Sequence, residues 1–161
     1  MVFPSPIISE PYAIENQWID YNGHFNMAYY NVLFDKDSDV ALALVGLGPE
    51  YVRKTGNSYF TLEAHISYLR ELTVHDRVRI STQFLDYDAK RLHYVQHMLH
   101  ADEGWVACVS ENIVMHVDLS TKKSSPFPVD VLEKIKFACA AHKKLPIPLQ
   151  VGHKIGIPRK T

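Results

Sequence analysis

Two different spacings of apolar residues divide the chain. From residue 27 to about residue 47 the spacing is helical, which predicts one long helix. The apolar positions expected to supply its packed surface are Leu33, Val40, Ala41, Leu42 and Leu47. Asp37 and Asp39 are expected to mark its solvated side. Gly46 and Gly48 are placed to end this helix, and Pro49 predicts a short second helix over residues 49–54.

After Gly56 the spacing changes from helical to alternating, which is typical of strands. Four long strands are predicted, over residues 59–72, 77–87, 91–101 and 105–119. On the first strand, one face is expected to carry Phe60, Leu62, Ala64, Ile66 and Tyr68. The other face is then expected to carry Tyr59, Thr61, Glu63 and His65. The short, turn-like connections between these strands predict an antiparallel meander.

Three further segments complete the expected organisation. A short strand broken by Pro11 is predicted within residues 7–15, a closing helix over residues 129–143, and a basic tail to residue 161. The order of elements indicates an α+β fold, in a single domain of residues 1–161. One long helix covers only one face of such a sheet well, so the remaining apolar surface is expected to meet a partner subunit.

Composition excludes several classes of function. The formal charge of −1 gives no overall field that would attract nucleic acid. No apolar run is long enough to cross a membrane, and the first residues do not resemble a signal peptide. Cys108 and Cys139 match neither a disulfide framework nor a zinc pattern, so we expect a cytoplasmic protein.

A metal site is not expected. His93, His97 and His100 invite that reading, but His93 and His97 are four residues apart in an extended strand. At ~3.3 Å per residue they lie roughly 13 Å apart, which is too far to share one ion. No zinc-protease motif and no glycine-rich phosphate loop is present either.

The densest group of chemically useful side chains precedes the long helix, from Asp20 to Asn26. A carboxylate there, partly dehydrated by Trp18 and Tyr21, can act as a general base or as a nucleophile. It can equally be a turn or capping aspartate, and the loop alone does not decide between the two. Asn26 is a good N-cap for the helix, and we favour that role for it.

Backbone groups of the same region suit an oxyanion. Gly23 lets the chain approach a ligand closely, and the amides of Met27 and Ala28 lie in the first helical turn. Such amides can stabilise negative charge that develops on a carbonyl oxygen. Aromatic residues crowd the same place, and most are expected to belong to the core. They are Trp18, Tyr21, Phe25, Tyr29 and Tyr30.

The order of elements and the loop together resemble hotdog-fold acyl-CoA thioesterases, in which a curled antiparallel sheet wraps a long central helix. The loop is similar to the Asp-x-x-Gly loop of the 4-hydroxybenzoyl-CoA thioesterase family, which implies that Asp20 is the catalytic carboxylate. It is also similar to the Asp-x-Asn-x-His pattern of acyl-ACP thioesterases, which implies supporting roles for Asn22 and His24. In that pattern a catalytic glutamate follows on a strand, where this chain has Glu63.

Three other stretches resemble a bacterial branch that is linked to carnitine dehydrogenase and whose proposed substrate is betainyl-CoA. They are residues 63–71, 86–91 and 152–158. The resemblance implies no metal or redox cofactor, since coenzyme A is part of the substrate, and a homodimer or a dimer of dimers. The aromatic group, with Trp18 and Tyr30, would suit a quaternary ammonium acyl group through cation–π attraction, and it would equally suit an aryl group.

Basic residues are the expected contacts for the phosphates of coenzyme A. We predict this role for Lys90 and Arg91, with Lys154, Arg159 and Lys160 of the tail as further candidates. For each residue alone, a solvated turn or tail is the simpler explanation. Two other functions remain open, a hotdog hydratase or dehydratase and a non-catalytic acyl-CoA-binding module.

Overall fold

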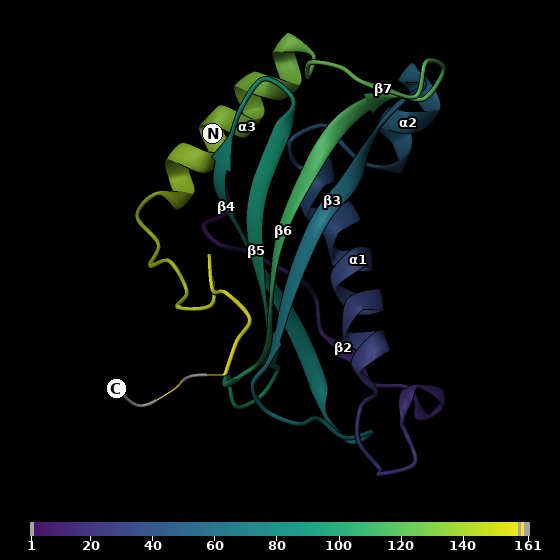
Figure 1. Cartoon of the computed structure of the whole chain (residues 1–161), viewed down its shortest axis with the longest axis vertical. Helices are drawn as coiled ribbons and strands as arrows, with labels where there is room; N and C mark the ends of the chain where they lie inside the picture. The colour runs from purple at the N-terminus through teal and green to yellow at the C-terminus, as the bar shows by residue number, and fades with distance from the viewer. Residues whose placement is uncertain (1, 158, 160–161) are drawn as a thin grey trace.

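The computed structural model describes residues 2–157 and 159, so Lys160 lies outside the described residues. The helices and strands follow one another as shown in Figure 1. They are β1 (Ile7–Ile8), β2 (Tyr12–Ala13), the 3-10 turn η1 (Asn16–Trp18), α1 (Met27–Ala43), α2 (Pro49–Thr55), β3 (Asn57–Tyr68), β4 (Arg77–Tyr87), β5 (Arg91–His100), β6 (Val106–Asp118), β7 (Lys123–Ser124) and α3 (Val129–His142).

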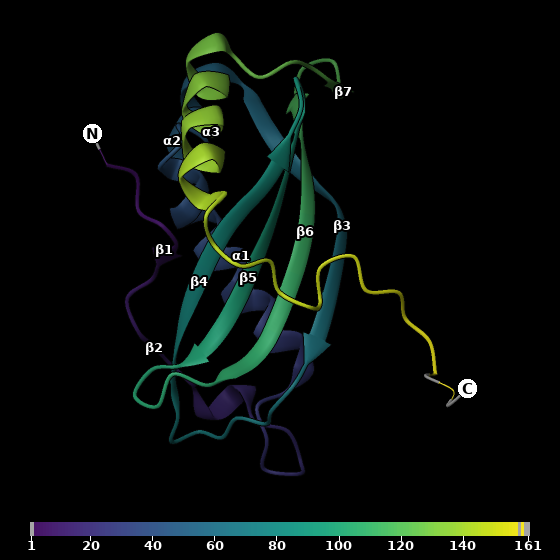
Figure 2. The same ribbon diagram turned by 90° about the vertical axis from the view of Figure 1, so that its left-hand side faces the viewer.

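One antiparallel sheet forms the centre of the molecule. Its strands lie in the order β1-β4-β5-β6-β3, while β2 also pairs with β4 and β7 with β6. Helix α1 lies along one face of the sheet, and the C-terminal segment crosses the opposite, outer face (Figures 1 and 2). Helix α3 packs at the β4 edge, where Val131 and Ile135 share a core cluster with Leu42 of α1. Strand β3 is an edge strand, with β6 as its only neighbour among the described residues.

Helix α1 begins where the sequence predicts and ends earlier. The Asn26 side chain accepts a hydrogen bond from the Ala28 amide at 3.0 Å, which caps the first turn. Its α-helical residues end at Ala43, and Gly46 follows in a left-handed conformation with φ of 88°. The helix packs one stripe of residues at spacings of three and four against the sheet. They are Tyr30, Leu33, Phe34, Asp37, Ser38, Ala41 and Leu42.

The prediction that Asp37 faces water is wrong. Its side chain lies within the buried stripe of α1 and is only 2% exposed. Its Oδ2 accepts a hydrogen bond from the Thr82 hydroxyl of β4 at 3.0 Å and a longer one from the Gln96 amide of β5 at 3.4 Å. Burial raises the pKa of this carboxyl group to about 6, against the lowering effect of these two donors.

A β-bulge corrects the predicted faces of the first long strand. The register between β3 and β6 shifts between Thr61 and Glu63. Tyr59 and Tyr68 are an odd number of residues apart, yet both hydroxyls reach α1, at Asp39 Oδ1 (2.6 Å) and at the Met27 carbonyl (3.1 Å). Tyr59 therefore joins Tyr68 on the α1 face, while Glu63 stays on the outer face.

The remaining long elements agree with the sequence to within a few residues. Strand β4 has the predicted bounds, and β3 ends at Tyr68 because the next two amides both donate to the Ala107 carbonyl of β6. The first predicted strand is two short pieces, β1 and β2, on either side of Pro11, which has no amide hydrogen to donate. Two small elements, η1 and β7, have no sequence signal that we identified.

Candidate active site

The polar loop before α1 is closed by its own backbone. Ile19 and Phe25 form an isolated antiparallel bridge across it. The Asp20 amide donates to the His24 carbonyl at 2.9 Å, and the Gly23 amide donates to the Asp20 carbonyl at 3.0 Å. Gly23 has φ of 80°, a left-handed conformation that favours glycine. The segment is thus a folded turn, and its side chains are displayed from a fixed backbone.

The Asp20 carboxylate is fixed at one oxygen and open at the other. Its Oδ1 accepts hydrogen bonds from the backbone amides of Asn22 at 2.8 Å and His24 at 3.2 Å. No group in the described part of the chain donates to its Oδ2. The Asn22 side chain likewise makes no hydrogen bond within residues 2–157, so Asn22 supports Asp20 through its backbone.

The amides of the first three residues of α1 differ in whether they have an acceptor. The Ala28 amide is used by the Asn26 cap, and the Tyr29 amide donates to the Asn26 carbonyl at 3.0 Å. The Met27 amide has no acceptor among the described residues. Of the two backbone donors predicted to bind an oxyanion, the geometry therefore favours Met27, and Ala28 is already engaged.

The end of β3 and the segment that follows it make hydrogen bonds to the loop and to the first residue of α1. The Phe25 amide donates to the Leu72 carbonyl at 2.8 Å, and Tyr68 reaches the Met27 carbonyl. The His24 Nε2 atom lies 3.1 Å from Glu71 Oε2. The sequence predicts no functional role for Glu71, because this residue falls at the end of the predicted strand 59–72, whereas β3 ends at Tyr68.

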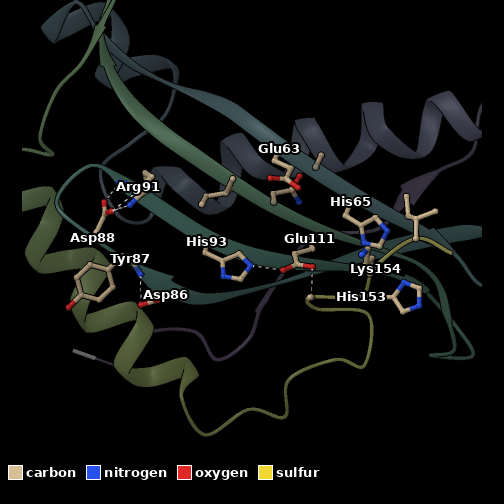
Figure 3. Close-up of a pocket in the computed structure, with 15 residues that line it drawn as sticks. Glu63, His65, Asp86, Tyr87, Asp88, Arg91, His93, Glu111, His153 and Lys154 are labelled. Carbon is tan, nitrogen blue, oxygen red and sulfur yellow. Dashed lines mark hydrogen bonds and ion pairs between the residues drawn. The ribbon is translucent and has the colours of Figure 1, made fainter.

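Apart from the polar loop, a groove lies on the outer face of the sheet (Figure 3). It is a groove of about 840 Å³ between β3, β5, β6 and the C-terminal segment. Glu63, Arg91 and Lys154 all line it, although they are far apart in the sequence. The Glu111 carboxylate of β6 links the sheet to the C-terminal segment. Its Oε1 lies 2.8 Å from His93 Nε2 of β5, and its Oε2 accepts a hydrogen bond from the Gly152 amide at 2.7 Å. Asp20 is not part of this groove.

Comparison with known proteins decides the family. Residues 14–135 match the family model of the Thioesterase-like superfamily. The chain belongs to that superfamily. It is 38% identical over 143 residues to the betainyl-CoA thioesterase of Pseudomonas aeruginosa, covering 88% of this chain and 89% of the relative. It is 36% identical to the L-carnitine dehydrogenase/betainyl-CoA thioesterase of Rhizobium meliloti, of which it matches 28% of the length.

Solved structures share the fold of this chain. A Staphylococcus aureus protein in complex with CoA superposes with a TM-score of 0.89, at 29% identity and 98% coverage of both chains. The DHNA-CoA thioesterase of Staphylococcus aureus has a TM-score of 0.78 over 89% of this chain and 97% of its own, at 15% identity, and shows the fold alone. The predicted α+β hotdog fold is thereby confirmed.

The predicted aromatic contacts are mostly interior in this thioesterase-like chain. Trp18 is 7% exposed and Tyr30 is 4% exposed. The Tyr30 ring packs between those of Phe25, at a centroid distance of 4.4 Å, and Tyr68, at 5.2 Å, and burial raises the pKa of its hydroxyl. The rings of Trp18, Phe25 and Tyr30 support the loop and present little open surface to an acyl group within this chain. Tyr21, predicted to help dehydrate Asp20, is instead 97% exposed.

Lys90 and Arg91 lie at the turn between β4 and β5, at the opposite end of the sheet from the polar loop (Figure 1). The Lys90 ammonium donates to Ser124 Oγ at 3.3 Å. The Arg91 guanidinium is already engaged by Asp88, with Nε at 2.7 Å from Oδ2. One protomer therefore does not bring this pair to Asp20, and their contact with coenzyme A phosphates stays a prediction.

Glu63 is also separated from the polar loop in one protomer. It points to the outer face, as Figure 3 shows, whereas the loop precedes the helix on the opposite face. The described residues contain no group of three or more His, Cys, Asp or Glu that could hold a metal ion. No described helix is both long and apolar enough to span a membrane.

Proposed function

We propose that this chain is an acyl-CoA thioesterase that hydrolyses its substrate at the Asp20 loop. One observation carries the proposal, namely a carboxylate with one open oxygen next to a helix start whose Met27 amide has no acceptor in the described chain. The similarity to a betainyl-CoA thioesterase over most of both chains supports the reaction. Coenzyme A enters as part of the substrate, and the reaction needs no other cofactor.

The geometry suits attack by water or by Asp20 itself on the thioester carbonyl. As a base, the free Oδ2 of Asp20 takes a proton from water while the oxygen of that water adds to the carbonyl carbon. As a nucleophile, Oδ2 adds directly, and water then hydrolyses the anhydride that forms. In either case the Met27 amide stabilises the oxyanion, a contribution of about 2.7–4 kcal/mol in other oxyanion holes. The tetrahedral adduct then collapses with cleavage of the carbon–sulfur bond, and coenzyme A leaves as its thiolate; in the nucleophilic route this cleavage forms the anhydride and precedes its hydrolysis.

The acyl group that we propose is betainyl, as in the name of the Pseudomonas aeruginosa relative. This group carries a trimethylammonium one methylene group away from the reacting carbonyl. Asp20 supplies a carboxylate in the loop, and nearby negative charge favours a cationic acyl group.

The active enzyme is proposed to be a homodimer, joined through the β3 edge, or a dimer of such dimers. Strand β3 offers 12 residues of unpaired edge, and Phe60 and Leu62 on it are each 51% exposed. A second copy would cover these side chains and extend the sheet. It would also bring residues of the partner close to the loop, which is how Glu63, Lys90 or Arg91 could act.

We further propose a single cytoplasmic domain. The described residues share one sheet, and both cysteines are free thiols, Cys108 buried and Cys139 partly so.

A matched pair of substrates tests the proposal. Betainyl-CoA and 3,3-dimethylbutanoyl-CoA have the same shape and differ only by a positively charged nitrogen in place of a carbon. Release of free thiol is expected from betainyl-CoA, with a higher kcat/KM than from its neutral analogue. Equal values of kcat/KM for the two substrates would contradict the preference for a cationic acyl group but not the proposed hydrolysis. Binding without thiol release would indicate a binding module, and hydration of crotonyl-CoA would indicate the hydratase.

A further inference from the structure

We infer that Glu71 is a positioning residue of the active site, which acts by orienting the His24 imidazole. The inference rests on the proposed function. The observation behind it is the distance of 3.1 Å between His24 Nε2 and Glu71 Oε2, which joins a side chain of the loop to a side chain of the segment after β3. Glu71 supplies a carboxylate next to the loop on the α1 side of the sheet, whereas Glu63 points away on the outer face.

The contact is not needed to hold the fold. The two side chains are 45% and 70% exposed, and exposed ion pairs contribute little to stability. The loop is already closed by the Ile19–Phe25 bridge and fastened by the Phe25 amide to Leu72. A residue that adds little to stability but restrains one side chain of the reacting loop fits a positioning role better.

His24 is held from two sides by carboxylates. Its backbone amide donates to Asp20 Oδ1 at 3.2 Å, and its ring approaches Glu71 with Nε2. A carboxylate next to Nε2 favours a proton on that nitrogen and leaves Nδ1 as the one that can accept a hydrogen bond. Nδ1 is then free to orient water or to contact the thioester. This is the arrangement in which a third group fixes the tautomer and direction of a working imidazole.

The variant Glu71→Gln tests the inference. It keeps the length of the side chain and removes its charge. We expect kcat for the preferred acyl-CoA to fall on the order of tenfold to 100-fold with KM within about twofold, because substrate binding is left intact. Glu50→Gln is the matched control, since Glu50 is an equally exposed glutamate that pairs with Lys54 in α2, at the opposite end of α1 from the loop (Figure 1). It is expected to leave kcat within about twofold.

Two further measurements separate positioning from a general loss of structure. In His24→Asn, adding Glu71→Gln is expected to cause no further loss of kcat, because the glutamate then has nothing to orient. Nitrogen-15 spectra of the histidine rings are expected to show His24 with its proton on Nε2 in the wild type and a mixture of tautomers in Glu71→Gln. The spectra need no turnover, so they test the pairing even if no acyl-CoA is hydrolysed.

An unchanged kcat in Glu71→Gln, or equal losses from the glutamate change in the presence and absence of His24, would overturn the inference. An unchanged tautomer ratio would overturn it as well. A wild type that releases no thiol from any acyl-CoA while the tautomer still depends on Glu71 would instead count against the proposed function alone.

Discussion

Two aspartates near α1 have opposite environments. Asp20 precedes the helix in a partly exposed loop, where two backbone amides donate to one oxygen and the other oxygen is open. Asp37 lies inside the helix, almost fully buried, and its partners are the neutral side chains of Thr82 and Gln96. No cation pairs with Asp37 within the described residues.

The difference shows what solvent access decides. Burial holds the pKa of Asp37 at about 6, so at neutral pH the fold carries an ionised carboxylate without a counter-charge. Asp20 keeps access to solvent and accepts two backbone hydrogen bonds, so its carboxylate can contact a water molecule and a substrate. An aspartate before the helix is thus available for catalysis, whereas an aspartate in the core lowers the stability of the folded state.

The largest effect is expected from Asp20→Asn. Asparagine keeps an oxygen that can accept from the amides of Asn22 and His24, so the loop should keep its shape. It has no basic or nucleophilic carboxylate, and kcat for thiol release should fall on the order of 1,000-fold. The melting temperature should stay close to that of the wild type. Full activity in a folded variant would remove Asp20 from the mechanism.

Asp37→Asn is expected to make the folded state more stable. The substitution removes the buried charge and keeps an oxygen for Thr82 and Gln96. We expect the free energy of unfolding at pH 8 to rise by about 1–3 kcal/mol, since each unit of pKa shift corresponds to about 1.4 kcal/mol. Urea titrations of both proteins measure this. Asp35→Asn is the matched control, because Asp35 is exposed on the same helix.

The pH dependence fixes the sign of the Asp37 effect. Its folded pKa of about 6 lies above the ordinary value of 3.8, so the folded state holds the proton more tightly. The stability from this group is complete below pH 3.8 and is lost as pH rises through about 6. The gain from Asp37→Asn should therefore be present at pH 8 and largely absent near pH 4. A gain of equal size at both pH values would show that charge is not its cause.

The start of α1, the bounds of β4 and the position of the candidate site could be predicted from the sequence, because they depend on local patterns. The start of α1 follows from Asn26 as a cap, and β4 follows from strict alternation between two turns. The Asp20 loop was found because its residues are contiguous. These features need only near neighbours in the chain, which the sequence shows directly.

The features that the sequence did not predict depend on distant partners. Asp37 looks solvated by residue type, and only its contacts with Thr82 and Gln96 of the sheet show that it lies inside. The bulge between Thr61 and Glu63 reversed the faces of the part of β3 that precedes it, since one extra residue breaks a period of two. Glu71 meets His24 only when the fold brings two segments together.

Thr82→Val tests how far the neutral partners support Asp37. Valine keeps the shape of threonine and removes the hydroxyl that donates to the carboxylate. The free energy of unfolding at pH 8 should fall by about 1–2 kcal/mol, as for a lost hydrogen bond to a buried group. The loss should be smaller near pH 4, where the carboxyl group is protonated. Equal losses at both pH values would assign the effect to packing.

The smallest effect is expected from Asn26→Ala, which separates capping from catalysis in the loop. Removing the side chain frees the Ala28 amide and should lower the free energy of unfolding by about 1 kcal/mol. Asn22→Ala is the control, since that side chain makes no hydrogen bond in residues 2–157, and it should leave stability unchanged. If Asn26 serves only as a cap, kcat measured well below the melting temperature should stay within about threefold of the wild type. A loss of kcat as large as that of Asp20→Asn would instead place the Asn26 side chain among the groups that contact the substrate.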